Sequence, residues 1–202
     1  MKFLVCIAIL GALSVIPVYP ANIVVNGSFE MPDVPTGSFG LFGSIPGWTL
    51  ASGPSIEIQD RVAGTPFQGN QFLELDSTGN SSVYQDLSTT PGLYTLSFAF
   101  SPRPGVAANS MQVFWNGSPL TTINVTGTGL PDTSWTVYSF GVTATGSTTR
   151  LQFTGLGPSD STGEYVDDVM VDNVPEPASM GLLLSGALLV AVLYTRNRLR
   201  AV

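Results

Sequence analysis

The side chains available for chemistry in this sequence are mostly carboxylates. Histidine is absent from all 202 residues, and the only lysine and cysteine, Lys2 and Cys6, lie at the apolar N-terminus. Nucleophile–histidine pairs, Schiff-base lysines and histidine metal centres are therefore excluded for the rest of the chain. What remains for catalysis is a pair of carboxyl groups, as used in glycoside hydrolysis.

Glu57 and Glu74 fit such a pair better than the other acidic residues. Both fall in short apolar runs typical of strands, where burial would raise the pKa of a carboxyl group. No motif distinguishes these two, so the sequence favours a protein without catalytic activity and leaves a glycoside hydrolase as the weaker alternative.

Aromatic residues in expected loops are the candidates for binding a sugar. Phe39 and Phe42 lie in a glycine-rich segment, 35–47, Phe67 precedes Gly69, and Arg103 follows an expected strand. Aromatic rings stack on the apolar faces of pyranose rings, while arginine donates hydrogen bonds to hydroxyls. Exposed aromatic rings are costly unless they contact something. The tryptophans lie in or beside expected strands and are expected to pack in the core: Trp48, Trp115 and Trp135.

Short strands must position these groups. Apolar and polar residues alternate over 94–101, and the same period of two over 111–115 leads into the hairpin signal Asn116-Gly117. No helical periodicity occurs before residue 174. The pattern predicts an all-β, antiparallel β-sandwich. The further expected strands are 23–25, 56–58, 72–75, 83–87, 120–125, 135–142, 150–153 and 165–171.

The two ends of the chain differ from this middle part. Lys2 followed by an apolar run predicts a signal peptide over 1–21, which leaves the sandwich domain at 22–173 and a tail at 174–202. Between 22 and 174, three arginines face thirteen acidic residues, a net charge of about −10. Such a surface repels nucleic acid and excludes it as a partner.

The tail has three parts in a fixed order. A Pro-Glu-Pro sequence precedes an apolar stretch over 178–194, which is a predicted transmembrane helix, and a basic cluster ends the chain. This order resembles the PEP-CTERM sorting signal of Gram-negative bacteria. The resemblance implies transient anchoring in the inner membrane, processing by an exosortase-type enzyme and delivery to the cell surface or extracellular matrix. A plain single-pass anchor is the alternative. The sorting residues are Pro175, Glu176, Pro177, Arg196, Arg198 and Arg200.

A series of short motifs within the domain also resembles the pattern of a known family. It runs from 26–30 (NGSFE) through 45–48 (IPGW), 69–75 (GNQFLEL) and 91–94 (PGLY) to 165–169 (YVDDV). This order is similar to the galactose-binding-like jelly-roll family, and in particular to a domain of unknown function in plant cell-wall proteins. The resemblance implies a β-sandwich that binds polysaccharide without cleaving it, often with a structural calcium ion.

The resemblance also implies ligands for that calcium ion. The first and last strands of a jelly roll are commonly neighbours, so Glu30 would lie near Asp167 and Asp168. Calcium takes six to eight oxygen ligands, and neighbouring residues of a strand point to opposite faces. Glu30 with Asp168 or Asp167 is therefore the expected calcium site.

Taken together, these patterns predict an exported, non-catalytic surface protein that binds polysaccharide. A structural matrix protein without a specific ligand, in which the acidic domain acts as a soluble spacer, is the alternative.

Overall fold

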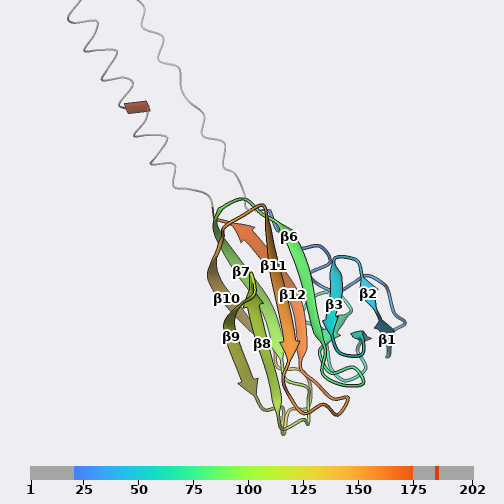
Figure 1. Ribbon diagram of the computed structural model, residues 1–202. Helices are drawn as coiled ribbons and strands as arrows, with labels where there is room; N and C mark the ends of the chain where they lie inside the picture. The colour runs from blue at the N-terminus through green and yellow to red at the C-terminus, as the bar shows by residue number, and fades with distance from the viewer. Residues whose placement is uncertain (1–20, 175–184, 187–202) are drawn as a thin grey trace, which may run out of the picture.

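The computed structural model describes residues 21–174 and 185–186 (Figure 1). The predicted signal peptide lies outside the described residues except for its last residue. The predicted transmembrane helix lies outside them except for two residues, and the six sorting residues lie outside them entirely. No helix in the described part of the chain is long and apolar enough to cross a membrane.

Two antiparallel six-stranded sheets form the domain, which confirms the predicted all-β sandwich. Sheet A contains, in spatial order, β1 (Ser38–Phe42), β4 (Ile56–Asp60), β5 (Phe72–Glu74), β12 (Tyr165–Asn173), β7 (Gly92–Ser101) and β10 (Thr136–Ala144). Sheet B contains β2 (Ser44–Ile45), β3 (Trp48–Ser52), β6 (Ser82–Ser88), β11 (Thr148–Gly155), β8 (Asn109–Trp115) and β9 (Ser118–Val125).

The core lies between the two sheets and is rich in aromatic rings. Phe98 of sheet A contacts Phe153 of sheet B with ring centroids 5.2 Å apart, and Phe153 lies 5.9 Å from Trp48. All three side chains are buried. The alternation in β7 therefore has the predicted cause, since Leu96, Phe98 and Phe100 fill the core and the residues between them face outward.

Two expectations about the N-terminal third are wrong. Segment 23–25 forms no strand, although the Ile23 amide donates to the Val171 carbonyl at 3.0 Å, so it lies beside the last strand as expected. Segment 35–47, expected to be a loop, contains β1 and β2. Its glycines suggested a loop, but β1 is paired with β4 along its whole length, and those tertiary hydrogen bonds outweigh a weak local preference.

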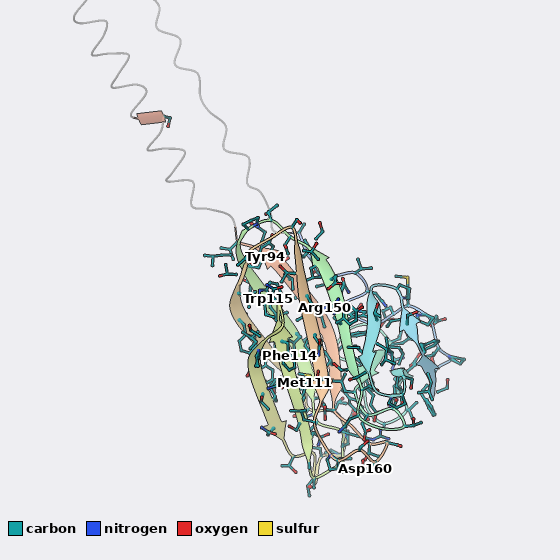
Figure 2. The ribbon with its side chains drawn as sticks, viewed as in Figure 1. Tyr94, Met111, Phe114, Trp115, Arg150 and Asp160 are labelled. Carbon is teal, nitrogen blue, oxygen red and sulfur yellow. The ribbon has the colours of Figure 1, made fainter. Side chains whose placement is uncertain are left out.

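The two ends of the described domain lie together. Ile23 is hydrogen-bonded to Val171, and Val174 is hydrogen-bonded to Leu93. Tyr94 lies at this end of the sandwich, whereas Asp160 lies at the opposite end (Figure 2). Gly27 is part of this contact between the two ends of the domain, since its carbonyl accepts a hydrogen bond from the Val169 amide at 2.9 Å. A β-carbon added at Gly27 would lie 2.1 Å from the Val169 carbonyl oxygen.

Gly27→Ala should therefore destabilise the domain. The clash is with backbone that cannot rotate away, so we expect a loss of about 1–3 kcal/mol in the free energy of unfolding, as in other overpacked sites. Gly141→Ala is the matched control, because nothing lies within 4 Å of its added β-carbon. Urea denaturation of both variants checks this, and an unchanged midpoint for Gly27→Ala would contradict the described contact.

Candidate functional site

The outer face of sheet A carries a row of ionisable side chains. Glu57 of β4 lies opposite Glu74 of β5, and Glu74 lies opposite Tyr165 of β12. Residues directly opposite on neighbouring strands share a face. Since Ile56 and Ile58 on either side of Glu57 point into the core, the row faces away from it. Loops cover this face, so that Glu57 and Glu74 are 5% and 1% exposed.

The edge strand β1 adds an apolar wall to this row. Phe39 lies opposite Gln59, and Leu41 lies opposite Glu57, so both share the outer face. Phe39 is 53% exposed. Phe42, three residues after Phe39, lies on the other face and packs against the core. The expectation that Phe42 binds a ligand beside Phe39 is therefore corrected, because residues an odd number apart in a strand point to opposite faces.

A pocket of about 270 Å³ lies over this part of the sheet. Its apolar wall comes from β1 and from the loop after β4, its floor from β4, and its polar rim from three further loops. The lining residues are Phe39, Leu41, Val62, Glu57, Gln59, Arg103, Ser77, Thr78 and Ser161. Two of the four residues expected to bind a ligand, Phe39 and Arg103, are thus brought together from opposite halves of the domain.

Glu74 organises the floor of this pocket. Its Oε1 accepts hydrogen bonds from Arg103 Nη1 at 2.6 Å and from the Gly163 amide at 2.8 Å. Its Oε2 accepts from Gln59 Nε2. The Arg103 guanidinium also lies 6.0 Å from the centre of the Tyr165 ring. One buried carboxyl group thereby fixes the loop after β7, the loop before β12 and the side chain of β4.

Gln59, which lines the pocket, has an unused acceptor atom. Its Nε2 donates to Glu57 Oε1 at 3.0 Å as well as to Glu74, and these two acids fix the orientation of the amide. Its Oε1 is buried and has no hydrogen-bond partner. Because a buried polar atom without a partner is costly, this oxygen is a candidate acceptor for a hydrogen bond from a ligand.

The two carboxyl groups of the floor hold protons more tightly than free ones. Burial, followed by the charge of Glu57, raises the pKa of Glu74 to about 8, against the opposing effect of Arg103. Burial also raises the pKa of Glu57, which is hydrogen-bonded to Glu74. Two carboxyl groups in direct contact cannot both ionise easily, so the pair retains a shared proton near neutral pH.

Asp76 secures the loop that forms one side of the pocket. Its Oδ2 accepts hydrogen bonds from the Asp160 and Thr162 amides at 2.9 and 3.2 Å, which holds Ser161 between them at the rim. This loop lies at the end of the sandwich marked by Asp160, away from the chain ends (Figure 2). Glu164 is another buried acid near Asp76, and burial raises the pKa of its carboxyl group to about 7.

Two of the three residues expected to bind calcium, Glu30 and Asp167, meet at one loop. Glu30 Oε1 accepts from the Asn70 and Gln71 amides at 2.8 and 3.0 Å. Asp167 Oδ2 accepts from the Phe67 and Gln68 amides, both at 2.9 Å. Both carboxylates hold segment 67–71, so early and late parts of the chain converge here.

Both oxygens of Asp167 already accept backbone hydrogen bonds, because its Oδ1 accepts from the Asp168 amide at 2.7 Å. Burial raises the pKa of Asp167 to about 7, against the effect of its three amide donors. Asp168 lies at a bulge in β12 with φ of 48°. Within the described part of the chain, no three acidic, histidine or cysteine side chains are grouped to hold a metal. A calcium ion would thus rely on Glu30, Asp168 and backbone carbonyls.

Phe67 lies outside the pocket. Its ring is 43% exposed and contacts Trp135 edge-on, with centroids 6.2 Å apart. Trp135 in turn donates from Nε1 to the Thr65 carbonyl at 2.8 Å. Phe67 is therefore part of an aromatic pair with Trp135 and lies in the loop between β4 and β5.

Comparison with known sequences gives distant relatives. No family model matches the chain. It is 29% identical over 154 residues to a multifunctional-autoprocessing repeats-in-toxin protein of Vibrio vulnificus, and 28% identical over 154 residues to that of Vibrio cholerae. Each match covers 74% of this chain, which spans 3% of the length of these much longer proteins.

Comparison with solved structures shows the fold. The carbohydrate-binding module TmCBM61, solved in complex with β-1,4-galactotriose, aligns with a TM-score of 0.53. The alignment covers 76% of this chain and 99% of that module, with 15% sequence identity. The chain therefore has the jelly-roll fold of that module, as predicted.

The buried acids should make the domain less stable as the pH rises. Burial raises the pKa of Glu74, Glu164 and Asp167 from about 4 to between 7 and 8. Between pH 4 and pH 8 these carboxyl groups therefore bind more protons in the folded state than in the unfolded state. The free energy of unfolding then falls with increasing pH. We expect Tm to be at least about 3 °C lower at pH 8.5 than at pH 5.5, as measured by circular dichroism.

Glu57→Gln should make this pH dependence shallower, because it removes the neighbouring charge that opposes ionisation of Glu74. Asp33→Asn, which changes an exposed acid, is the control and should preserve the wild-type slope. Equal slopes for wild type and Glu57→Gln would show that the two acids are not coupled.

Proposed function

We propose that this protein is an exported, non-catalytic surface or matrix protein that binds polysaccharide through the pocket on the outer face of sheet A. The observation that carries the proposal is the pairing of an exposed ring, Phe39, with a buried free acceptor, Gln59 Oε1, in one pocket. This combination suits a ligand with one apolar face and hydroxyl groups along its edge, as a pyranose ring has.

Each part of the pocket has a role in this proposal. Phe39 stacks on a sugar ring, Gln59 Oε1 accepts a hydrogen bond from a hydroxyl, and Arg103 donates to another. A volume of about 270 Å³ is small among ligand pockets and suits a single sugar unit. Phe39 and Leu41 of the lining belong to β1, the edge strand of sheet A. A smooth polar surface would instead have favoured the spacer alternative.

The geometry of the acids supports a binding rather than a hydrolytic role. Glycosidases place their two carboxyl groups on either side of the scissile bond, about 5–10 Å apart. Glu57 and Glu74 are hydrogen-bonded to each other and to the same amide group, which leaves no room for a glycosidic bond between them. In the proposal they form the floor and fix Gln59 and Arg103.

The structural relative supports a sugar ligand. TmCBM61 has the same fold and was solved with a β-1,4-linked galactotriose. Because a fold hosts many functions, the argument for binding by this chain rests on its own pocket, and the relative adds a first ligand to try.

Export and surface delivery complete the proposal. The Pro-Glu-Pro sequence, apolar stretch and basic cluster support processing by an exosortase-type enzyme at the inner membrane of a Gram-negative bacterium. Both ends of the described domain lie opposite the end marked by Asp160 (Figure 2). An attachment through residues beyond Val174 would therefore leave the loop that carries Ser161 directed away from it, toward an external polysaccharide.

Phe39→Ala should weaken glycan binding by about tenfold or more, because an aromatic anchor in a pocket contributes about 1–2 kcal/mol. Phe67→Ala is the matched control, since that ring is similarly exposed but lies outside the pocket. A glycan array gives the ligand, and isothermal titration calorimetry of the three proteins then gives Kd.

Two results would contradict this assignment. A loss of binding in Phe67→Ala with none in Phe39→Ala would place the site at the aromatic pair with Trp135. No binding to any glycan by the folded wild-type protein would leave the structural matrix role as the better account.

Calcium remains part of the proposal through Glu30 and Asp168. We expect calcium to raise Tm by several degrees relative to a chelator, because a ligand that binds only the folded state stabilises it. Asp168→Asn should abolish this increase, whereas Asp33→Asn should preserve it. Differential scanning fluorimetry measures both, and identical Tm values for the wild type with calcium and with chelator would contradict the calcium site.

A further inference from the structure

We infer that the pocket selects uncharged sugar units and rejects acidic ones such as uronates. This inference rests on the proposed function, and it concerns which class of polysaccharide the same site binds. Two independent features carry it, the distribution of charge around the pocket and the direction of its free hydrogen-bonding groups.

The first feature is that the cations of the domain are already paired. Arg103 Nη1 lies 2.6 Å from Glu74 Oε1, Arg61 lies 3.2 Å from Asp60, and Arg150 lies 2.7 Å from Asp86. These arginines are the only basic side chains between residues 22 and 174. A carboxylate of a glycan would thus find no basic side chain that is free of a carboxylate partner in the described domain.

The charge of the pocket floor is zero or negative as long as one of its acids is ionised. Arg103 contributes one positive charge, whereas Glu57 and Glu74 contribute two negative charges when both are ionised and one when they share a proton. The floor is therefore neutral or negative in these two states, inside a domain with a net charge of about −10. An anionic ligand would have to lose its water against this field, and like-charge contacts are a strong means of excluding a ligand.

The second feature is that the floor offers acceptors. Gln59 Oε1 is buried and free, while Gln59 Nε2 is used by Glu57 and Glu74. Glu57 also lines the pocket and is a further acceptor. A sugar hydroxyl can donate to such atoms. An ionised carboxylate can only accept hydrogen bonds, so a carboxylate in the place of that hydroxyl would leave Gln59 Oε1 without a partner.

Pairs of polymers that differ only at the C6 group test this inference. Suitable pairs are galactan and polygalacturonan, mannan and polymannuronan, and glucan and polyglucuronan, each matched in linkage and length. We expect the neutral member of the bound pair to bind about tenfold or more tightly than its acidic partner at low salt. The ratio should fall as salt increases, because screening reduces the repulsion.

Two variants locate the discrimination. Above the pKa of Glu74, which is about 8, both acids are ionised. At such a pH Glu57→Gln removes one of the two negative charges of the floor and should lower the neutral-to-acidic affinity ratio severalfold. Asp172→Asn changes the net charge equally, but near the opposite end of β12, where Asp172 lies opposite Thr95, and should leave the ratio unchanged. The ratio is measured within each variant, so any general weakening of binding cancels.

Equal or tighter binding of the acidic member would overturn the inference and leave glycan binding intact. An unchanged ratio in Glu57→Gln would also overturn it, since the floor would then not be the source of selection. Failure of every polymer to bind the folded protein would instead overturn the proposed function itself.

Discussion

The carboxyl group of Glu74 accepts hydrogen bonds from three separate parts of the chain, the Arg103 side chain, the Gly163 amide and the Gln59 amide group. It is 1% exposed and lies on the outer face of a sheet, where a charge is costly unless it has partners. Those partners determine the candidate site. Arg103 and the loop before β12 form its sides because they are bound to Glu74, and the Gln59 oxygen stays without a partner while its nitrogen is bound to the two acids. Removal of this one group would release all three.

The antiparallel register explains why the pocket lies where it does. A single row crosses the sheet from Leu41 through Glu57 and Glu74 to Tyr165, and the next row begins with Phe39 and Gln59. Because β1 lies at the edge of sheet A, its outward side chains form an apolar wall beside a polar floor. The opposite face of the same strands fills the core with aliphatic and aromatic groups. The alternation of side chains between the two faces of these strands therefore produces both the packed core of the sandwich and the amphipathic character of its pocket.

The sequence predicted the fold class well because alternation is a local signal. The period of two in β7 and β8 was clear, whereas β1 was missed because its glycines resemble a loop and its pairing with β4 is a tertiary contact. The candidate site was predicted only in part. Phe39 and Arg103 were expected to bind the ligand and do line the pocket. Phe42 was expected there too, but it lies on the opposite face of β1, and this could not be foreseen while the segment was taken for a loop. Glu57 and Glu74 were considered only as a catalytic pair for the weaker glycosidase alternative. Their direct contact depends on the register between β4 and β5, which a single sequence does not show. Gln59 was missed, although its alternation with Ile56, Glu57 and Ile58 would have placed it beside Glu57.

The most direct test of this account is to locate a bound glycan on the protein. Two-dimensional NMR of the isotope-labelled protein, titrated with the neutral oligosaccharide that binds best, reports every backbone and glutamine side-chain amide. The account predicts that the largest shifts occur at the Gln59 side chain and at Phe39, Leu41 and Ser161, with sheet B unaffected. Shifts confined to sheet B, or to Phe67 and Trp135, would contradict it, because the sugar would then bind outside the pocket that Glu74 organises.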